Sequence, residues 1–144
     1  MDTKQELTYR ITASASSLNE GTANTGKNSI SFGVTKKDTL PSPAELLIAT
    51  FAACCLKNVE RFSEFMKYEY ESAEISVTAN RQEKPPMIRA LDFELIIHSK
   101  KTGINADLLL RNLQKFGTIY NTLNAVCEIN GDIQISLEKA IDTE

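Results

Sequence analysis

The sequence predicts an α+β fold, in which strands precede a long helix and two further strands precede a second helix and a last strand. Residues 44 to about 68 contain no helix breaker, enough for roughly seven turns. Residues 73–82 and 87–99 alternate apolar and polar side chains, as half-buried strands do. Residues 102–124 carry apolar side chains at helical spacing. The order ββ–α–ββ–α–β differs from the alternating βαβ units of a parallel sheet.

The N-terminal segment predicts two strands joined by a loose loop. Apolar side chains such as Tyr9 and Ile11 alternate with polar ones, which indicates a strand over residues 6–16. Residues 19–28 are rich in turn formers and predict the loop, and residues 29–35 predict the second strand.

The long helix has a clear start signal. Ser42 suits the N-cap, Pro43 suits the first helical position, and Glu45 completes a capping box. The first half of this helix is apolar on nearly every side, so we expect it to run through the middle of the molecule. One chain of 144 residues could hardly cover such a helix alone, which predicts an obligate homodimer.

The later elements follow from spacing and turn signals. A turn at residues 84–86 joins the strands 73–82 and 87–99. The apolar face of the second helix carries Leu109, Leu113, Phe116, Tyr120 and Leu123. Residues 125–138 alternate like a strand, but the Asn-Gly pair at 130–131 predicts a turn that interrupts it.

Composition narrows the classes of function. The length predicts a single domain over residues 1–144, and a net charge of −3 argues against a nucleic-acid-binding face. The longest apolar run, residues 46–56, is too short to cross a bilayer, so we expect no membrane partner. The opening residues lack the apolar core of a signal peptide, and three cysteines without an export signal predict reduced thiols in a cytoplasmic protein.

Two adjacent cysteines lie in the apolar part of the long helix, and helix geometry points them in different directions. Cys55 shares its face with apolar Phe51 and Val59, which indicates a small core residue. The face of Cys54 carries Leu47, Thr50, Lys57, Asn58 and Arg61. A thiol with cations one and two turns away is the one expected to ionise. We expect no disulfide between the two neighbours, because a regular helix splays adjacent side chains.

The only histidine is His98, which falls on the same strand face as Asp92 and Glu94. That placement favours a solvent-facing residue. A nucleophile–base pair would need His98 beside Cys54, and the sequence leaves this open. With one histidine and no Cys-x-x-Cys motif, we expect no metal site, and we expect no cofactor.

Residues 42–55, SPAELLIATFAACC, resemble the Ser-Pro-x-Glu-Leu-Leu…Ala-x-Cys helix of the OsmC/Ohr family, the osmotically inducible protein C and organic hydroperoxide resistance proteins. Residues 115–123, KFGTIYNTL, resemble the family segment Lys-x-Cys-Pro-x-x-x-x-Leu, and the family's order of elements covers nearly the whole chain. The resemblance implies an intertwined homodimer with a thiol site at its interface. It also implies reduction of organic hydroperoxides, in which a peroxidatic cysteine becomes a sulfenic acid and then forms a disulfide with a second cysteine. The peroxidatic position falls on Cys54.

The chain departs from the family pattern at three places. Gly117 stands where the second, resolving cysteine is expected. Ala44 stands where the hydroperoxide-reductase branch has a glutamate, and the adjacent Glu45 points elsewhere. The family's activating N-terminal arginine has only Arg10 and Lys27 as nearby options.

These departures bear on the charge state of the Cys54 thiol. The helix dipole acts within the first turn, and Cys54 lies about three turns in, so without a close cation the thiol stays protonated. Lys57, three residues on, either serves the sulfur or reaches solvent. Cys54, Lys57 and Arg10 are therefore the candidate catalytic residues. Cys127 is either a buried strand residue or a relocated resolver.

Three functions stay open at this point, and the sequence does not decide whether the protein is an enzyme. The first is a one-cysteine peroxidase that reduces organic hydroperoxides and is recycled by an external thiol. The second is a dimer without peroxidase activity that binds a small apolar ligand in the interface pocket. The third is a structural dimer in which Cys54 only packs.

Overall fold

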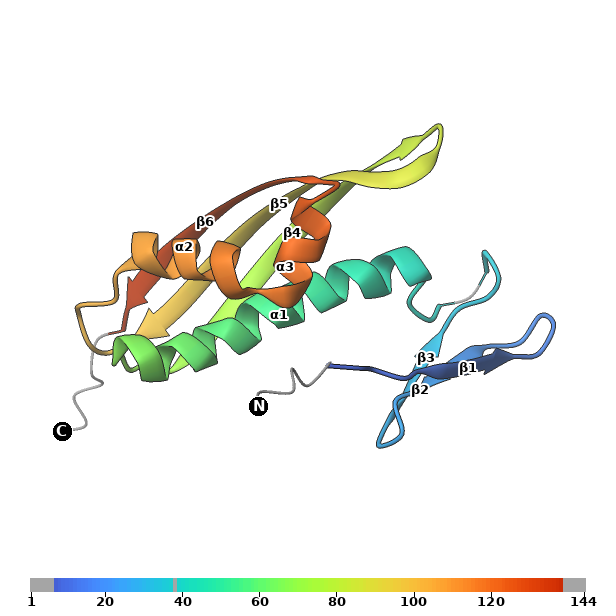
Figure 1. Cartoon of the computed structure of the whole chain (residues 1–144), viewed down its shortest axis with the longest axis horizontal. Helices are drawn as coiled ribbons and strands as arrows, with labels where there is room; N and C mark the ends of the chain where they lie inside the picture. Colours follow the sequence, from blue (N-terminus) through green and yellow to red (C-terminus); the bar gives the residue numbers. More distant parts are fainter. Residues whose placement is uncertain (1–6, 38, 139–144) are drawn as a thin grey trace, which may run out of the picture. The chain divides into compact units, whose positions relative to one another are not determined.

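The computed structural model describes residues 7–37 and 39–138, in two compact units whose boundary falls between Leu47 and Ile48. In chain order the elements are β1 (Thr12–Ala15), β2 (Gly21–Asn24), β3 (Ser29–Phe32), α1 (Pro43–Met66), β4 (Ser72–Glu83), β5 (Pro86–Ser99), α2 (Ala106–Phe116), α3 (Thr118–Asn124) and β6 (Glu128–Leu137) (Figure 1). The predicted α+β class is confirmed. Within the described residues, no helix is long and apolar enough to span a membrane.

The N-terminal unit holds a small antiparallel sheet with β2 in its centre. The strand predicted over residues 6–16 is regular only over residues 12–15, because it pairs with no more than the four residues of β2. The loop predicted over residues 19–28 contains β2 itself. Backbone pairing to both neighbours stabilises a strand there despite a sequence of turn formers.

The start of α1 agrees with its sequence signal. The Glu45 N–H donates to Ser42 Oγ at 3.2 Å, and the Ser42 N–H donates to Glu45 Oε1 at 3.1 Å, so the predicted capping box is confirmed. The helix ends at Met66, slightly earlier than predicted, and Lys67 follows with a φ of 55°. A residue in this left-handed region ends a helix, because the next residue cannot continue its hydrogen-bond pattern.

The second unit contains a three-stranded sheet with β5 in its centre, antiparallel to β4 and parallel to β6. Because β5 and β6 are parallel, the chain must return to the end of the sheet where β5 begins before it can enter β6. Helices α2 and α3 make this connection (Figure 1). The predicted alternation in β5 is confirmed, since its inward side chains are buried while the side chains between them are more exposed. The buried hydrophobic residues of β5 are Leu91, Phe93, Leu95 and Ile97.

The helices bury one face against this sheet. Phe51 of α1 is fully buried, and its ring centroid lies 5.7 Å from that of Phe93 in β5 and 5.4 Å from that of Tyr120 in α3. Leu109 and Leu113 of α2 are buried in the same cluster. This packing holds all three helices on one side of the sheet, and so it fixes how the helical residues after Ile48 are presented.

Two predictions in the C-terminal third are wrong. The helix expected over residues 102–124 is divided at Gly117, whose φ of −72° and ψ of 117° are extended rather than helical. The turn expected at residues 130–131 is absent, because β6 continues through both. Gly131 lies opposite Phe93 in the sheet, and a Cβ on Gly131 would come within 1.9 Å of the Phe93 ring. Glycine makes room there for a core ring.

The first half of α1 is less enclosed than its composition predicts. Leu47 is 40% exposed, and Ala49, Thr50 and Ala53 are exposed as well. The side of α1 that carries Phe51 is buried against the sheet, whereas this other side carries residues that are largely exposed. A helix that is apolar on both sides therefore passes along the edge of one chain's core rather than through its middle.

Candidate functional site

The two adjacent cysteines of α1 lie in different environments. Cys55 is 1% exposed in the core cluster, so its predicted burial is confirmed. Burial, with a smaller contribution from the charge of Cys54, raises the pKa of the Cys55 thiol to about 12. Cys55 therefore stays protonated at neutral pH. Cys54 is half-buried and is therefore the more exposed of the two residues.

The sulfur of Cys54 lies between groups from two parts of the second unit. On α1, one turn further, Nδ2 of Asn58 donates to the Cys54 carbonyl at 2.9 Å and lies 3.6 Å from the sulfur. On the other side, a Cβ built on Gly117 would lie 3.4 Å from the sulfur. Asn58 is only 7% exposed, although its spacing placed it on the polar face of the helix. Its position one turn from Cys54 was the available signal for a contact with the thiol.

Gly117 occupies the place from which a second thiol would reach Cys54. In a disulfide, the Cβ of one cysteine lies about 3 Å from the sulfur of the other. The 3.4 Å separation at Gly117 is close to that value. Because glycine has no side chain, this position brings no thiol to the sulfur of Cys54.

The other two candidate catalytic residues, Lys57 and Arg10, differ in how they relate to Cys54 along the chain. Lys57 is exposed on α1, and between residues 39 and 138 no hydrogen bond or ion pair joins it to Cys54. Arg10 belongs to the N-terminal unit, as does the second option, Lys27, whereas Cys54 belongs to the other unit. A role for either cation therefore stays a prediction.

An open, mostly apolar cavity of about 370 Å³ lies further along α1. Its lining residues are Arg61, Phe62, Phe65, Met66, Asn112 and Phe116. The guanidinium carbon of Arg61 lies between 5.6 and 5.9 Å from the ring centroids of Phe62, Phe65 and Phe116. On α1 its lining begins at Arg61, about two turns beyond Cys54, and on α2 it includes Phe116, which directly precedes Gly117.

The sequence did not reveal this cavity, because its lining comes from two helices that are distant along the chain. Phe65 is 71% exposed and Phe116 is 44% exposed, which is unusual for aromatic rings gathered in one place. Such rings beside a cation are suited to hold an apolar molecule that has a polar or anionic end.

Cys127 is buried, as one of the two sequence interpretations predicts, but it lies in a bend directly before β6 rather than within a strand. Its thiol donates to the Ile88 carbonyl at the start of β5 at 3.2 Å. Like Cys54 and Cys55, it is a free cysteine. The Cys127 sulfur is thus held against the backbone of a strand.

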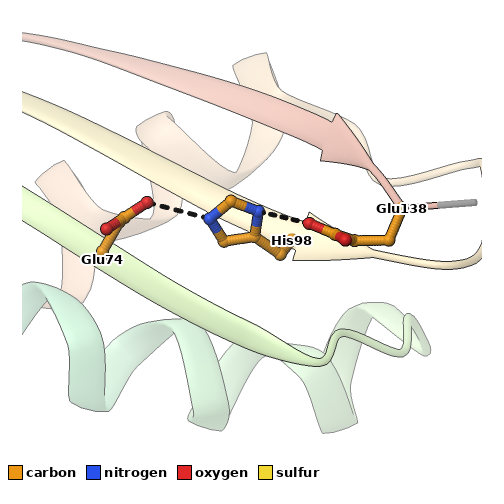
Figure 2. Close-up of polar contacts among 3 residues, drawn as sticks. All are labelled: Glu74, His98 and Glu138. Carbon is orange, nitrogen blue, oxygen red and sulfur yellow. Dashed lines mark hydrogen bonds and ion pairs between the residues drawn. The ribbon is translucent and has the colours of Figure 1, made fainter.

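His98 lies on the outward face of β5, opposite to the face on which α1 packs, so it does not form a pair with Cys54. Figure 2 shows its ring between two carboxylates, with Nε2 2.9 Å from Glu74 of β4 and Nδ1 2.9 Å from Glu138 beyond β6. Hydrogen bonds to Glu74, followed by those to Glu138 and the charges of both, raise the pKa of His98 above its ordinary value of 6.5. Within the described residues, no group of three metal-binding side chains is positioned to hold a metal ion.

We expect His98 to make the fold more stable in acid than in mild base. Only the protonated ring can donate to Glu74 and Glu138 at once. The contribution is therefore fully present below pH 6.5, the ordinary pKa, and is lost as the pH rises through the raised folded value. Urea unfolding from pH 6 to pH 9 should show a fall in midpoint that His98→Gln removes. A midpoint in the parent protein that is constant over this range would contradict the arrangement.

The comparisons with known proteins agree with this fold. The sequence model of a family described as OsmC-like protein matches residues 36–131, two thirds of the chain. No curated protein sequence matches the chain. Among solved structures, an OsmC like protein from Mycoplasma pneumoniae superposes with a TM-score of 0.81 at 19% identity, covering 92% of this chain and 99% of that one.

Two further solved structures carry names that mention hydroperoxides. An organic hydroperoxide resistance protein OsmC from Legionella pneumophila has a TM-score of 0.65 at 15% identity, covering 93% of this chain and 100% of that one. The organic hydroperoxide resistance protein OhrB of Bacillus subtilis has a TM-score of 0.61 at 16% identity, covering 89% and 98%. Likeness at such low identity shows a common fold.

Proposed function

The chain belongs to the OsmC-like protein family, and from this premise we propose that it is a thiol-dependent peroxidase in which Cys54 reduces an organic hydroperoxide. One observation carries the proposal. Of the three cysteines, only Cys54 is not buried, and its sulfur lies beside the amide donor of Asn58 and beside Gly117. Cys55 is a protonated core residue, and the Cys127 thiol donates a hydrogen bond to a backbone carbonyl of β5.

The first chemical step forms a sulfenic acid. The Cys54 thiolate attacks the outer oxygen of R–O–O–H, so that an S–O bond forms while the O–O bond breaks. The alkoxide RO⁻ leaves and takes a proton to become the alcohol. The sulfur is oxidised to Cys–SOH, and the peroxide is reduced.

The second half of the cycle needs thiols from outside the protein. Gly117 supplies no resolving sulfur, so a small thiol R′–SH attacks the sulfenic sulfur, water leaves, and a mixed disulfide forms. A second R′–SH then releases the Cys54 thiol together with R′–S–S–R′. A reducing cytoplasm would supply such thiols.

The apolar lining of the cavity beside α2 favours a substrate with an apolar group. Three phenylalanine rings line it, and its lining on α1 begins about two turns beyond Cys54. An apolar R group bound there would hold the peroxide end near Cys54 and would exclude water from part of the site. The positive charge of Arg61 at its edge suits a polar or anionic end of such a molecule.

We expect one equivalent of an organic hydroperoxide, such as cumene hydroperoxide, to add one oxygen to the intact protein. A sulfenic-acid reagent should trap this oxygen on Cys54, and excess peroxide should convert it to the irreversible sulfinic acid. Cys54→Ser should remove both the adduct and peroxide consumption with a small external thiol, while leaving the urea midpoint nearly unchanged.

Cys55→Ala is the matched control on the same helix. It should keep the oxygen adduct but lower the free energy of unfolding by about 1 kcal/mol, because it leaves a small cavity in the core. Loss of two hydrogens that map to Cys54 and Cys127 would instead show a relocated resolver. No modification, at peroxide levels that oxidise a free thiol, would contradict the peroxidase and leave the second candidate function, binding of an apolar ligand in the cavity.

A further inference from the structure

We propose that the side-chain amide of Asn58 stabilises the thiolate of Cys54 and is a catalytic residue of this site. The inference rests on the proposed function, because a stabilised thiolate serves the attack of Cys54 on the peroxide. Its geometry, however, is independent of that function: Nδ2 of Asn58 lies 3.6 Å from the sulfur, a normal separation for an N–H donor and a sulfur acceptor.

The orientation of the amide follows from its second contact. Nδ2 also lies 2.9 Å from the Cys54 carbonyl oxygen, which can only accept a hydrogen bond. If the amide were turned over, its own oxygen would face that carbonyl oxygen, and two acceptors would repel each other. The nitrogen is therefore the atom on this side, and its two hydrogens serve the carbonyl and the sulfur.

The burial of Asn58 indicates that the amide has a purpose beyond packing. Asn58 is 7% exposed and is the one buried polar side chain described in α1. Asparagine is a weak helix former, and a buried amide costs free energy unless it is hydrogen-bonded. The carbonyl at 2.9 Å already accepts within the helix, so a leucine would fill the same space without the cost of burying an amide.

Neither of the two cations on this helix face makes a described hydrogen bond or ion pair with the sulfur. Lys57 is exposed, and the guanidinium of Arg61 lies over the rings of the cavity. Cys55, the neighbouring titratable group, stays protonated. Gly117, on the side of α2 and α3, carries no charge. A hydrogen bond to a charged acceptor is about twice as strong as one between neutral groups, so the amide favours the thiolate over the thiol.

The test is the alkylation of Cys54 by iodoacetamide between pH 6 and pH 10, followed on the Cys54 peptide by mass spectrometry. In Asn58→Leu, the rate at pH 7 should fall roughly tenfold relative to its plateau at high pH, the effect of losing one hydrogen bond to a charged group. The plateau itself should stay the same, because the thiolate, once formed, reacts as before.

Asn58→Ser separates a role at the sulfur from a role in the helix. A serine hydroxyl can still donate to the carbonyl one turn back, but it is too short to reach the sulfur. We therefore expect Asn58→Ser to lose reactivity as Asn58→Leu does. A serine variant with the parent rate at pH 7 would show that the amide acts only on the backbone, and would overturn the proposal.

Asn121→Leu is the matched control. Its amide donates to the Lys115 carbonyl at 3.1 Å and makes no contact with a sulfur, so the same substitution should leave the alkylation profile unchanged. Alkylation needs no peroxide, so the outcomes are separable. An unchanged profile in Asn58→Leu would contradict the role of Asn58 even if Cys54 reduces peroxides. A changed profile without peroxide reduction would contradict only the peroxidase.

Discussion

Gly117→Cys should convert the oxidation product of Cys54 from a sulfenic acid into an intramolecular disulfide. The Cβ of the new side chain would lie 3.4 Å from the Cys54 sulfur, and a disulfide needs about 3 Å between these two atoms. A φ of −72° suits any residue at this position. After one equivalent of hydroperoxide, intact-mass measurement should show the loss of two hydrogens in place of the gain of one oxygen.

The new disulfide should also stabilise the fold. It closes a loop of roughly 60 residues, for which the chain-entropy estimate is about 4 kcal/mol, less any strain. Some strain is expected, because the Cβ would lie 2.8 Å from the Leu113 carbonyl oxygen and 3.0 Å from Tyr120 Cβ. Gly117→Ala carries the same steric cost without a thiol, so it should keep the sulfenic acid and measure the strain alone.

A thiol oxidant such as diamide tests the same geometry without a peroxide. If Gly117→Cys forms no disulfide with diamide while its fold is intact, the sulfur of Cys54 does not face this position. If it forms a disulfide with diamide but not with hydroperoxide, the geometry holds and the peroxidase proposal fails.

We propose that the protein is an obligate homodimer. It should therefore sediment at twice the 16.0 kDa mass of one chain. The N-terminal sheet has strands of four residues and leaves large side chains uncovered, with Leu7 84%, Tyr9 83% and Leu18 85% exposed. A small sheet of this kind is not stable alone. On α1, Leu47 is 40% exposed, and exposed apolar side chains of this kind favour association with a second copy.

An obligate dimer also predicts that stability depends on protein concentration. The urea midpoint should rise between about 1 and 100 μM chain, because association stabilises only the folded state. A mass of 16.0 kDa at micromolar concentration, with circular dichroism typical of an intact fold, would contradict the dimer. It would mean that the apolar surfaces of the chain are covered from within.

Several features that depend on regular helix and strand spacing were predicted correctly from the sequence. The capping box of Ser42 and Glu45 and the burial of Cys55 followed from spacings of three or four residues. The alternation in β5 followed from a period of two. Sequence patterns predict these features because helix and strand geometry repeats over a few residues.

The glycines and the site were decided by tertiary contacts. Gly117 interrupts a helix, whereas Gly131, beside a turn-forming asparagine, continues a strand because the ring of Phe93 lies over it. The sulfur of Cys54 meets Gly117 only because Phe51 packs between β5 and α3 and so fixes α1 against the other helices. Contacts between residues more than sixty positions apart depend on how whole elements pack, and no local period in the sequence records that packing.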